Sequence, residues 1–180
     1  MKKLLFLFGL LSLSINAQNK YLTKTGTVDF EASIPAFEAV SAKNNAVTAI
    51  LNIENGEFAS LVLVKGFRFK NALMEEHFNE NYAESDKFPK ASFKGTLQEF
   101  NIELLENTKT FGLNGILTFH GESKILKAVP VEVTKKENRI LLTGTFNVKA
   151  SEFNIKIPKV VSNKIAEDIL VSFNFELDKK

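Results

Sequence analysis

Apolar and polar residues alternate along most of this chain, and a two-residue period is typical of β-strands that bury one face. Near the start, Val28 and Phe30 share one face of such a run, while Asp29 and Glu31 share the other. Similar runs recur down to the C-terminus. The pattern predicts about eight strands, at residues 27–34, 46–53, 58–65, 91–105, 111–120, 125–134, 139–150 and 169–177.

Turn-forming residues separate most of these runs. Asn55-Gly56 lies between two β-rich runs, and Asn-Gly is a strong signal for a tight hairpin. Pro130 lacks a backbone donor, so it should lie at a strand edge or a bulge. Residues 151–168 are irregular but too apolar for a plain exposed loop. Polar stretches predict further turns or loops at residues 36–45, 106–109, 121–124 and 135–138.

The stretch 73–95 interrupts the strand pattern. Phe78 and Tyr82 are four residues apart, a spacing that places them on one side of a helix. Pro89 then pushes Phe88 out of the helical region, and a strand follows near Ala91. We therefore expect one short helix that lies across a sheet or caps the end of a barrel.

Strands joined by short turns pair with their neighbours, so these elements predict an all-β, antiparallel, up-and-down sheet. A sheet of about eight strands with one apolar face removes its edges by closing into a barrel. At that size the interior is either just filled by side chains or holds one small ligand. The alternation of residues does not distinguish a filled barrel from a lined one.

The first 17 residues have the pattern of a cleavable signal peptide. A basic start at Lys2 and Lys3 is followed by an apolar run and by Ala17, a small residue suited to cleavage. The run is shorter than the roughly 20 residues that a spanning helix needs. We therefore expect residues 18–180 to form one exported domain, periplasmic or secreted. The chain has no Cys, which excludes a lipid-modified cysteine at the cleavage site.

The charge balance argues against one class of function, nucleic-acid binding, and the aromatic content indicates the kind of interior. Removing Lys2 and Lys3 from the 23 basic residues leaves 21, which balances the 21 acidic residues. A chain without excess positive charge is a poor candidate for binding nucleic acid. Phe accounts for 17 of the 180 residues, against two Tyr and no Trp. Because Phe needs no hydrogen-bond partner when buried, this composition suits a dry interior.

A metal site has little support in the sequence. His77 and His120 are the only histidines, so a site would need both, together with carboxylates such as Glu75, Glu76 or Glu80. Their spacing matches no metal-binding motif. We therefore predict neither a metal nor another cofactor.

A hydrolase is equally unsupported. Ser85, His77 and Asp86 could be imagined as a triad, but no nucleophile-elbow motif accompanies them. The nearby acidic residues are typical of a solvated face. We predict no catalytic residues and no enzyme activity.

Three stretches have features beyond alternation. Residues 77–95, HFNENYAESDKFPKASFKG, place an acidic loop before Phe-Pro and a strand. Residues 113–126, LNGILTFHGESKIL, form a glycine-containing hairpin, and residues 166–177, AEDILVSFNFEL, form a closing strand. With the early strand near Val28, these stretches resemble the YceI-like family of exported lipid-binding proteins, also called polyisoprenoid-binding proteins. The hairpin is the most specific match, and the resemblance covers nearly all of the mature chain.

The chain departs from the family pattern at two places. Many members carry an Arg-Asp pair just before the segment that corresponds to His77-Phe78, where this chain has Met74-Glu75-Glu76. Ser151-Glu152-Phe153 also stands where members often place an Arg. At these two places the resemblance therefore gives no basis for an arginine contact to a ligand head group.

The resemblance implies a lipocalin-like extended barrel that holds one long apolar lipid, an isoprenoid or a fatty acyl chain, without catalysis. Such a protein could touch a membrane transiently and could be a monomer or a homodimer. The alternative is a filled barrel with a structural, adaptor or stress-related role. The candidate wall residues are inward positions of the predicted strands: Phe30, Phe93, Leu97, Leu117, Phe119, Phe146, Val148, Val171, Phe173 and Phe175.

Overall fold

The structure is a computed structural model that describes residues 19–35, 37–105 and 107–180. The expected signal peptide lies outside these residues. The described residues form one short α-helix and a set of strands, with single turns of other helix types between them. The strands are β1 (Lys20–Ser33), β2 (Ser41–Asn52), β3 (Glu57–Leu63), β4 (Arg68–Phe69), β5 (Lys90–Leu97), β6 (Lys109–Phe119), β7 (Glu122–Lys136), β8 (Arg139–Lys149) and β9 (Ile165–Lys179).

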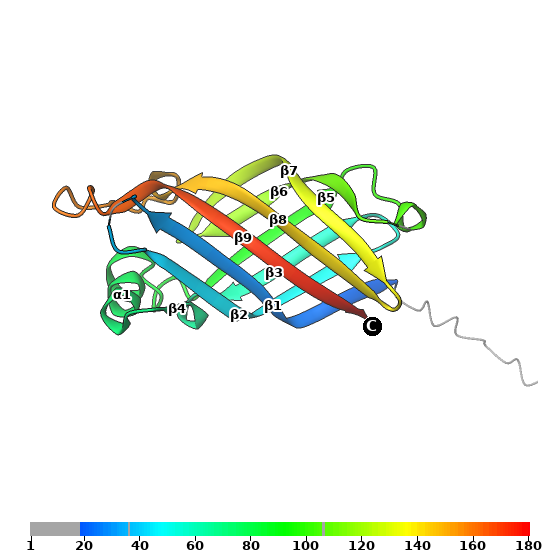
Figure 1. Cartoon of the computed structure of the whole chain (residues 1–180), viewed down its shortest axis with the longest axis horizontal. Helices are drawn as coiled ribbons and strands as arrows, with labels where there is room; N and C mark the ends of the chain where they lie inside the picture. The colour runs from blue at the N-terminus through cyan, green and yellow to red at the C-terminus, as the bar shows by residue number, and fades with distance from the viewer. Residues whose placement is uncertain (1–18, 36, 106) are drawn as a thin grey trace, which may run out of the picture.

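The long strands close into one antiparallel barrel (Figure 1). Each of them pairs with its neighbours in sequence, and β1 pairs with both β2 and β9, which closes the ring. The two-residue strand β4 only adds to β2. The predicted fold class, an all-β up-and-down barrel of eight strands with a short helix, is confirmed.

The helical segments lie at the ends of the barrel. The α-helix α1 (Ala72–His77) continues directly into a π-type turn, η2 (Phe78–Tyr82). Turns of 3-10 helix occur at η1 (Val64–Gly66), η3 (Ile102–Leu104) and η4 (Ala150–Phe153). None of the helices in the described part of the chain is long and apolar enough to span a membrane.

The end of the barrel that holds the C-terminus is packed solid. Large side chains from the ends of several strands meet there and are less than 2% exposed. They are contributed by strands on all sides of the barrel, so the interior at this end is filled by side chains. These residues are Leu51, Leu97, Val131, Val133, Ile140, Leu142 and Leu177.

Several predicted strand boundaries were wrong, by four to eight residues in the three cases below. β2 begins at Ser41 within the predicted loop, because Ser41 pairs with Glu31 across the first turn. β5 ends at Leu97 rather than at residue 105, since the Asn101 side chain accepts from the Glu103 N–H and starts η3. β9 begins at Ile165, four residues before the predicted start. In each case pairing or capping decided the boundary, not the local pattern.

A bulge in β7 changes which residues face inward. Leu113 pairs with Val129 and Gly115 pairs with Leu126, so two residues of β7 oppose Asn114 alone. The Asn114 Oδ1 accepts from the Ala128 N–H at 2.6 Å. The extra residue moves Leu126 to the interior and leaves Ile125, the first residue of the predicted strand 125–134, 66% exposed. Pro130 lies two residues after this bulge and pairs with Gly112 of β6, so it is close to a bulge but not within it.

Candidate functional site

A cavity of about 470 Å³ occupies the end of the barrel opposite the packed one. Its walls come from both ends of the sequence and from most of the strands, and nearly all of the lining is aliphatic or aromatic. The volume lies within the range of about 300–1,000 Å³ typical of small-molecule sites. The barrel is therefore filled at one end and lined at the other.

Nine of the ten predicted wall residues border this cavity, namely Phe30, Phe93, Leu117, Phe119, Phe146, Val148, Val171, Phe173 and Phe175. The tenth, Leu97, is 2% exposed and belongs to the packed end, at the last residue of β5. It faces inward as predicted, but too close to the closed end to reach the cavity. The placement of all ten is thus known, whereas their contact with a ligand stays a prediction.

Two inward-facing glycines make room for wall rings. A Cβ on Gly144 would lie 2.5 Å from the Phe173 ring, and a Cβ on Gly115 would lie 2.4 Å from the Phe93 ring. A glycine within a strand often marks such a close approach. Both glycines interrupt apolar alternation at inward positions, and that signal in the sequence could have identified them. Because the rings lie against the wall, they leave the centre of the barrel open.

Four phenylalanines cluster where the helical segment meets the barrel. Phe30 of β1 contacts three rings, with centroids 5.2 Å from Phe67, 5.8 Å from Phe69 and 5.4 Å from Phe78. Phe78 also lies 5.2 Å from Phe69. All four rings line the cavity. Only Phe30 was predicted as a wall residue, because the other three lie outside the long alternating strands.

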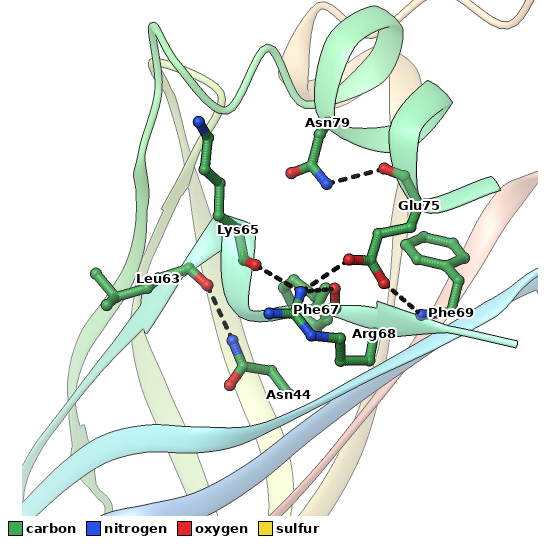
Figure 2. Close-up of polar contacts among 8 residues, drawn as sticks. All are labelled: Asn44, Leu63, Lys65, Phe67, Arg68, Phe69, Glu75 and Asn79. Atoms are coloured by element: carbon green, nitrogen blue, oxygen red, sulfur yellow. Dashed lines mark hydrogen bonds and ion pairs between the residues drawn. The ribbon is translucent and has the colours of Figure 1, made fainter. Parts of the chain in front are cut away.

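Glu75 fastens α1 to the barrel, as Figure 2 shows. One of its carboxylate oxygens accepts from the Arg68 guanidinium at 2.8 Å, and the other accepts from the Phe69 N–H at 3.2 Å. The helix starts at a cap, since the Asn71 side chain accepts from the Leu73 N–H at 2.9 Å. The helix therefore caps the end of the barrel, as predicted, above the four phenylalanines.

Three connecting segments surround the mouth of the cavity. The β1–β2 connection contributes Phe37 and Glu38, α1 and η2 contribute His77 and Tyr82 among others, and the β8–β9 connection contributes Lys164. The β8–β9 connection lies within residues 151–168, the irregular stretch whose sequence is too apolar for an exposed loop. The structure explains its composition, because its apolar residues Ile155, Ile157, Val161 and Ile165 line the cavity.

Both arginines and the Glu152 carboxylate are engaged in structural contacts. The chain has two arginines: Arg68 binds Glu75, and Arg139 pairs with Glu176 and Asp178. Neither lines the cavity. Glu152 in η4 accepts from Lys124 and from the Lys149 N–H. The hydrogen bond from Lys124, followed by that from Lys149, holds the pKa of Glu152 below its ordinary value.

The two histidines lie on different elements and have different surroundings. His120 is hydrogen-bonded through one ring nitrogen to the Phe153 carbonyl and through the other to the Glu84 carboxylate, both at 2.8 Å. His77 is the last residue of α1; its side chain is exposed and borders the mouth of the cavity. Within the described residues, no group of three or more His, Cys, Asp or Glu could hold a metal ion.

The imagined Ser85–His77–Asp86 triad is also not assembled. The Asp86 carboxylate pairs instead with Lys65, and Ser85 is 1% exposed. In residues 19–35, 37–105 and 107–180, no hydrogen bond links the three side chains. The arrangement of the site is that of a container for an apolar molecule.

The profile of the YceI-like domain family matches residues 19–177 of the chain. A search of curated proteins finds no significant match.

Solved structures share the fold at low sequence identity. A polyisoprenoid binding domain from Saccharophagus degradans, described as implicated in plant cell wall breakdown, is 12% identical with a TM-score of 0.77. The match covers 91% of this chain and 99% of that one. BcnA from Burkholderia cenocepacia is 15% identical, with a TM-score of 0.70, over 84% of this chain and 95% of that one. A YCEI protein from Campylobacter jejuni is 16% identical, with a TM-score of 0.60, over 76% and 83%.

Proposed function

The chain belongs to the YceI-like domain family, and we propose that it binds one long apolar lipid, an isoprenoid or a fatty acyl chain, in the lined half of its barrel. The observation that carries this proposal is the cavity of about 470 Å³ with its apolar wall. The description of the similar Saccharophagus degradans domain as polyisoprenoid binding points to the same ligand class.

The shape of the barrel favours a chain rather than a compact ligand. The packed residues around Leu142 close one end, while the mouth lies between α1 and the β8–β9 connection. A ligand must therefore enter lengthwise from one side. Ser60 is one of the few polar residues on the wall, and the ionisable lining residues Glu38, His77 and Lys164 come from the segments around the mouth. A lipid would thus place its tail deep in the barrel and any polar head at the mouth.

The affinity would come from burial of apolar area, at about 25 cal/mol per Å² before the costs of association are subtracted. A wall with few polar groups discriminates weakly among ligands of similar length. Among the described residues, the deep wall is apolar and the ionisable lining groups are confined to the mouth, which supports a role in binding without catalysis. A filled barrel with a structural or adaptor role would need no cavity, so the lined half favours the binding function.

The binding function predicts a dependence on chain length. In a series of prenols or fatty acids added to delipidated protein, affinity should rise about fourfold for each further CH₂ that is buried, which is about 0.8 kcal/mol. The rise should stop once the chain fills the cavity. Isothermal titration or competition with a fluorescent fatty acid measures both the slope and the plateau. Affinity that does not change with chain length would contradict binding inside the barrel.

We also propose that the protein is exported and works outside the cytoplasm. The support is the basic start, the apolar run and the small residue at Ala17. The expected mature protein begins at Gln18, and intact-mass analysis of the exported form measures this directly. Recovery of the full chain, still carrying residues 1–17, from a membrane fraction would argue against cleavage.

A further inference from the structure

We propose that the β8–β9 connection, residues 154–164, is a docking site for the surface of an anionic lipid bilayer. The segment follows η4 and ends where β9 begins. In Figure 1 it is the orange loop that projects beyond the barrel at the end where α1 lies. Docking there would place the mouth of the cavity against the membrane. The docking itself is independent of the proposed function, whereas its use for lipid exchange rests on that function.

The loop has two different faces. Its inner face contributes Ile155, Ile157 and Val161 to the wall of the cavity. Its outer face presents Val160, which is 83% exposed, the highest exposure among the large apolar side chains of the described residues. A turn holds Val160 in this position, because the Val161 N–H donates to the Pro158 carbonyl at 3.0 Å. An apolar tip held in water in this way is suited to insertion into a lipid surface.

Cationic side chains flank the apolar tip. Lys156, Lys159 and Lys164 are all exposed, and residues 154–164 contain no acidic residue. Within the part of the chain that the structure describes, none of these three ammonium groups has a carboxylate within ion-pair distance. Since residues 19–180 carry 21 basic and 21 acidic side chains, the positive charge is a local property of this loop.

Nearby carboxylates do not neutralise the loop. The Glu152 carboxylate pairs with Lys124, and Glu167 accepts from the Ser151 N–H at 2.9 Å. Asp168 faces Lys149 at 3.9 Å. All three are therefore engaged outside the loop, and the lysines remain available for the phosphate groups of anionic lipids.

The other two segments at the mouth determine how the protein would approach a membrane. Phe37 is 46% exposed and Leu73 is 56% exposed, so both add apolar surface. However, Glu38 lies beside Phe37 in sequence, and the exposed Glu76 and Glu80 accompany Leu73. Carboxylates are repelled by an anionic surface, so the protein should dock with the lysine-rich loop first and α1 tilted away.

A bilayer fits this surface better than a protein partner does. Peripheral binding combines buried apolar area with electrostatic attraction to anionic lipids, and the loop supplies one apolar tip and three lysines within eleven residues. Each lysine near an anionic surface is worth about 1 kcal/mol, roughly a fivefold gain in affinity. Binding should therefore be weak, reversible and sensitive to salt, as transient delivery or collection of a lipid requires.

The absence of Trp from the chain makes insertion directly measurable. Val160→Trp places a single indole at the tip of the loop. Leu104→Trp is the matched control, at a 44% exposed position in η3 at the packed end of the barrel. With vesicles of phosphatidylcholine containing about one third phosphatidylglycerol, Val160→Trp emission should shift to the blue and Leu104→Trp emission should not. With phosphatidylcholine alone, neither should shift.

The charge requirement is tested in the same Val160→Trp background. Lys156→Gln with Lys159→Gln should weaken vesicle binding about 30-fold. Lys135→Gln with Lys136→Gln makes the same charge change on the β7–β8 hairpin at the packed end and should have little effect. All four lysines are exposed, and thermal melting verifies that each variant folds. Equal losses from both pairs, equal binding to phosphatidylcholine alone, or no blue shift for Val160→Trp would each overturn the proposal.

Failure of docking and failure of lipid binding are distinguishable. Neither Lys156, Lys159 nor Val160 lines the cavity, so the lipid that co-purifies should be unchanged in the lysine variant. A protein that carries lipid but does not bind anionic vesicles would refute the docking site alone. A Val160→Trp variant whose indole inserts into vesicles, in a protein that never carries lipid, would refute the proposed function alone.

Discussion

Leu142→Ala is expected to lower the free energy of unfolding by about 2–5 kcal/mol, since it removes a fully buried side chain from the packed end of the barrel. Leu142 is 0% exposed and lies among Val131, Val133, Ile140 and Leu177, all of them less than 2% exposed. Its removal leaves a void, because the surrounding strands are hydrogen-bonded to one another and cannot move inward to fill it. The cavity at the other end is untouched, so lipid content should not change.

Phe173→Ala should lower the free energy of unfolding less than a change in a filled core does, and it should alter the bound lipid. In a filled core this change costs about 3–5 kcal/mol. Phe173 stacks on Phe175 with ring centroids 5.5 Å apart, but it also borders the cavity. Part of its surface already lacks packing partners in the ligand-free protein, so we expect a loss below about 3 kcal/mol. The lined half of the barrel should nevertheless hold less lipid or prefer a different chain length.

Urea unfolding of delipidated protein, followed by far-ultraviolet circular dichroism, measures both free energies. Lipid content is measured on the same variants before delipidation. A Phe173→Ala loss as large as that of Leu142→Ala, with no change in bound lipid, would mean that both ends of the barrel are packed.

Ser60→Phe is expected to leave the free energy of unfolding unchanged or to raise it, while it abolishes lipid binding. Ser60 lies on β3 opposite Phe93 of β5 and lines the cavity. A ring at this position would fill open space, so the cost of overpacking does not arise. The new ring would occupy part of the volume of about 470 Å³ that the lipid requires.

A neighbouring position supplies the control. Ala49 of β2 pairs directly with Ser60, is 0% exposed and does not line the cavity. Ala49→Phe inserts a ring into packed surroundings and should cost about 1–3 kcal/mol or more. The two variants therefore differ in the sign or size of their effect on stability although they lie side by side. Similar losses from both would show that no usable space exists next to Ser60.

The barrel itself could be predicted from the sequence because alternation, hairpin turns and edge removal all depend on local residue order. The Asn55-Gly56 turn and the inward set of β8 appear where they were expected. The bulge of β7 could not be predicted, because it depends on the Asn114 side chain of the opposite strand. Simple alternation from Val129 would place Ile125 on the same face, whereas Ile125 is 66% exposed and Val129 is 7% exposed.

The division of the barrel into a packed half and a lined half also could not be predicted from the sequence. Leu142 and Phe146 face inward from the same strand, four residues apart, yet the first is fully buried in the core and the second borders the cavity. Their alternation pattern is identical. What separates them is the set of side chains on the opposite wall, including those of the β3–β5 connection, which brings Phe67, Phe69 and Phe78 to the mouth. Such contacts form between segments that are distant in sequence, so the alternation of residues within one strand does not predict them.

Native mass spectrometry of the protein purified from the cells that produce it tests the central claim most directly. We predict that the wild-type protein carries the added mass of one long-chain lipid, which appears in the organic extract, and that Ser60→Phe, folded and equally stable, carries none. A wild-type protein without bound lipid, whose extract contains no more lipid than that of Ser60→Phe, would contradict the lipid-binding function.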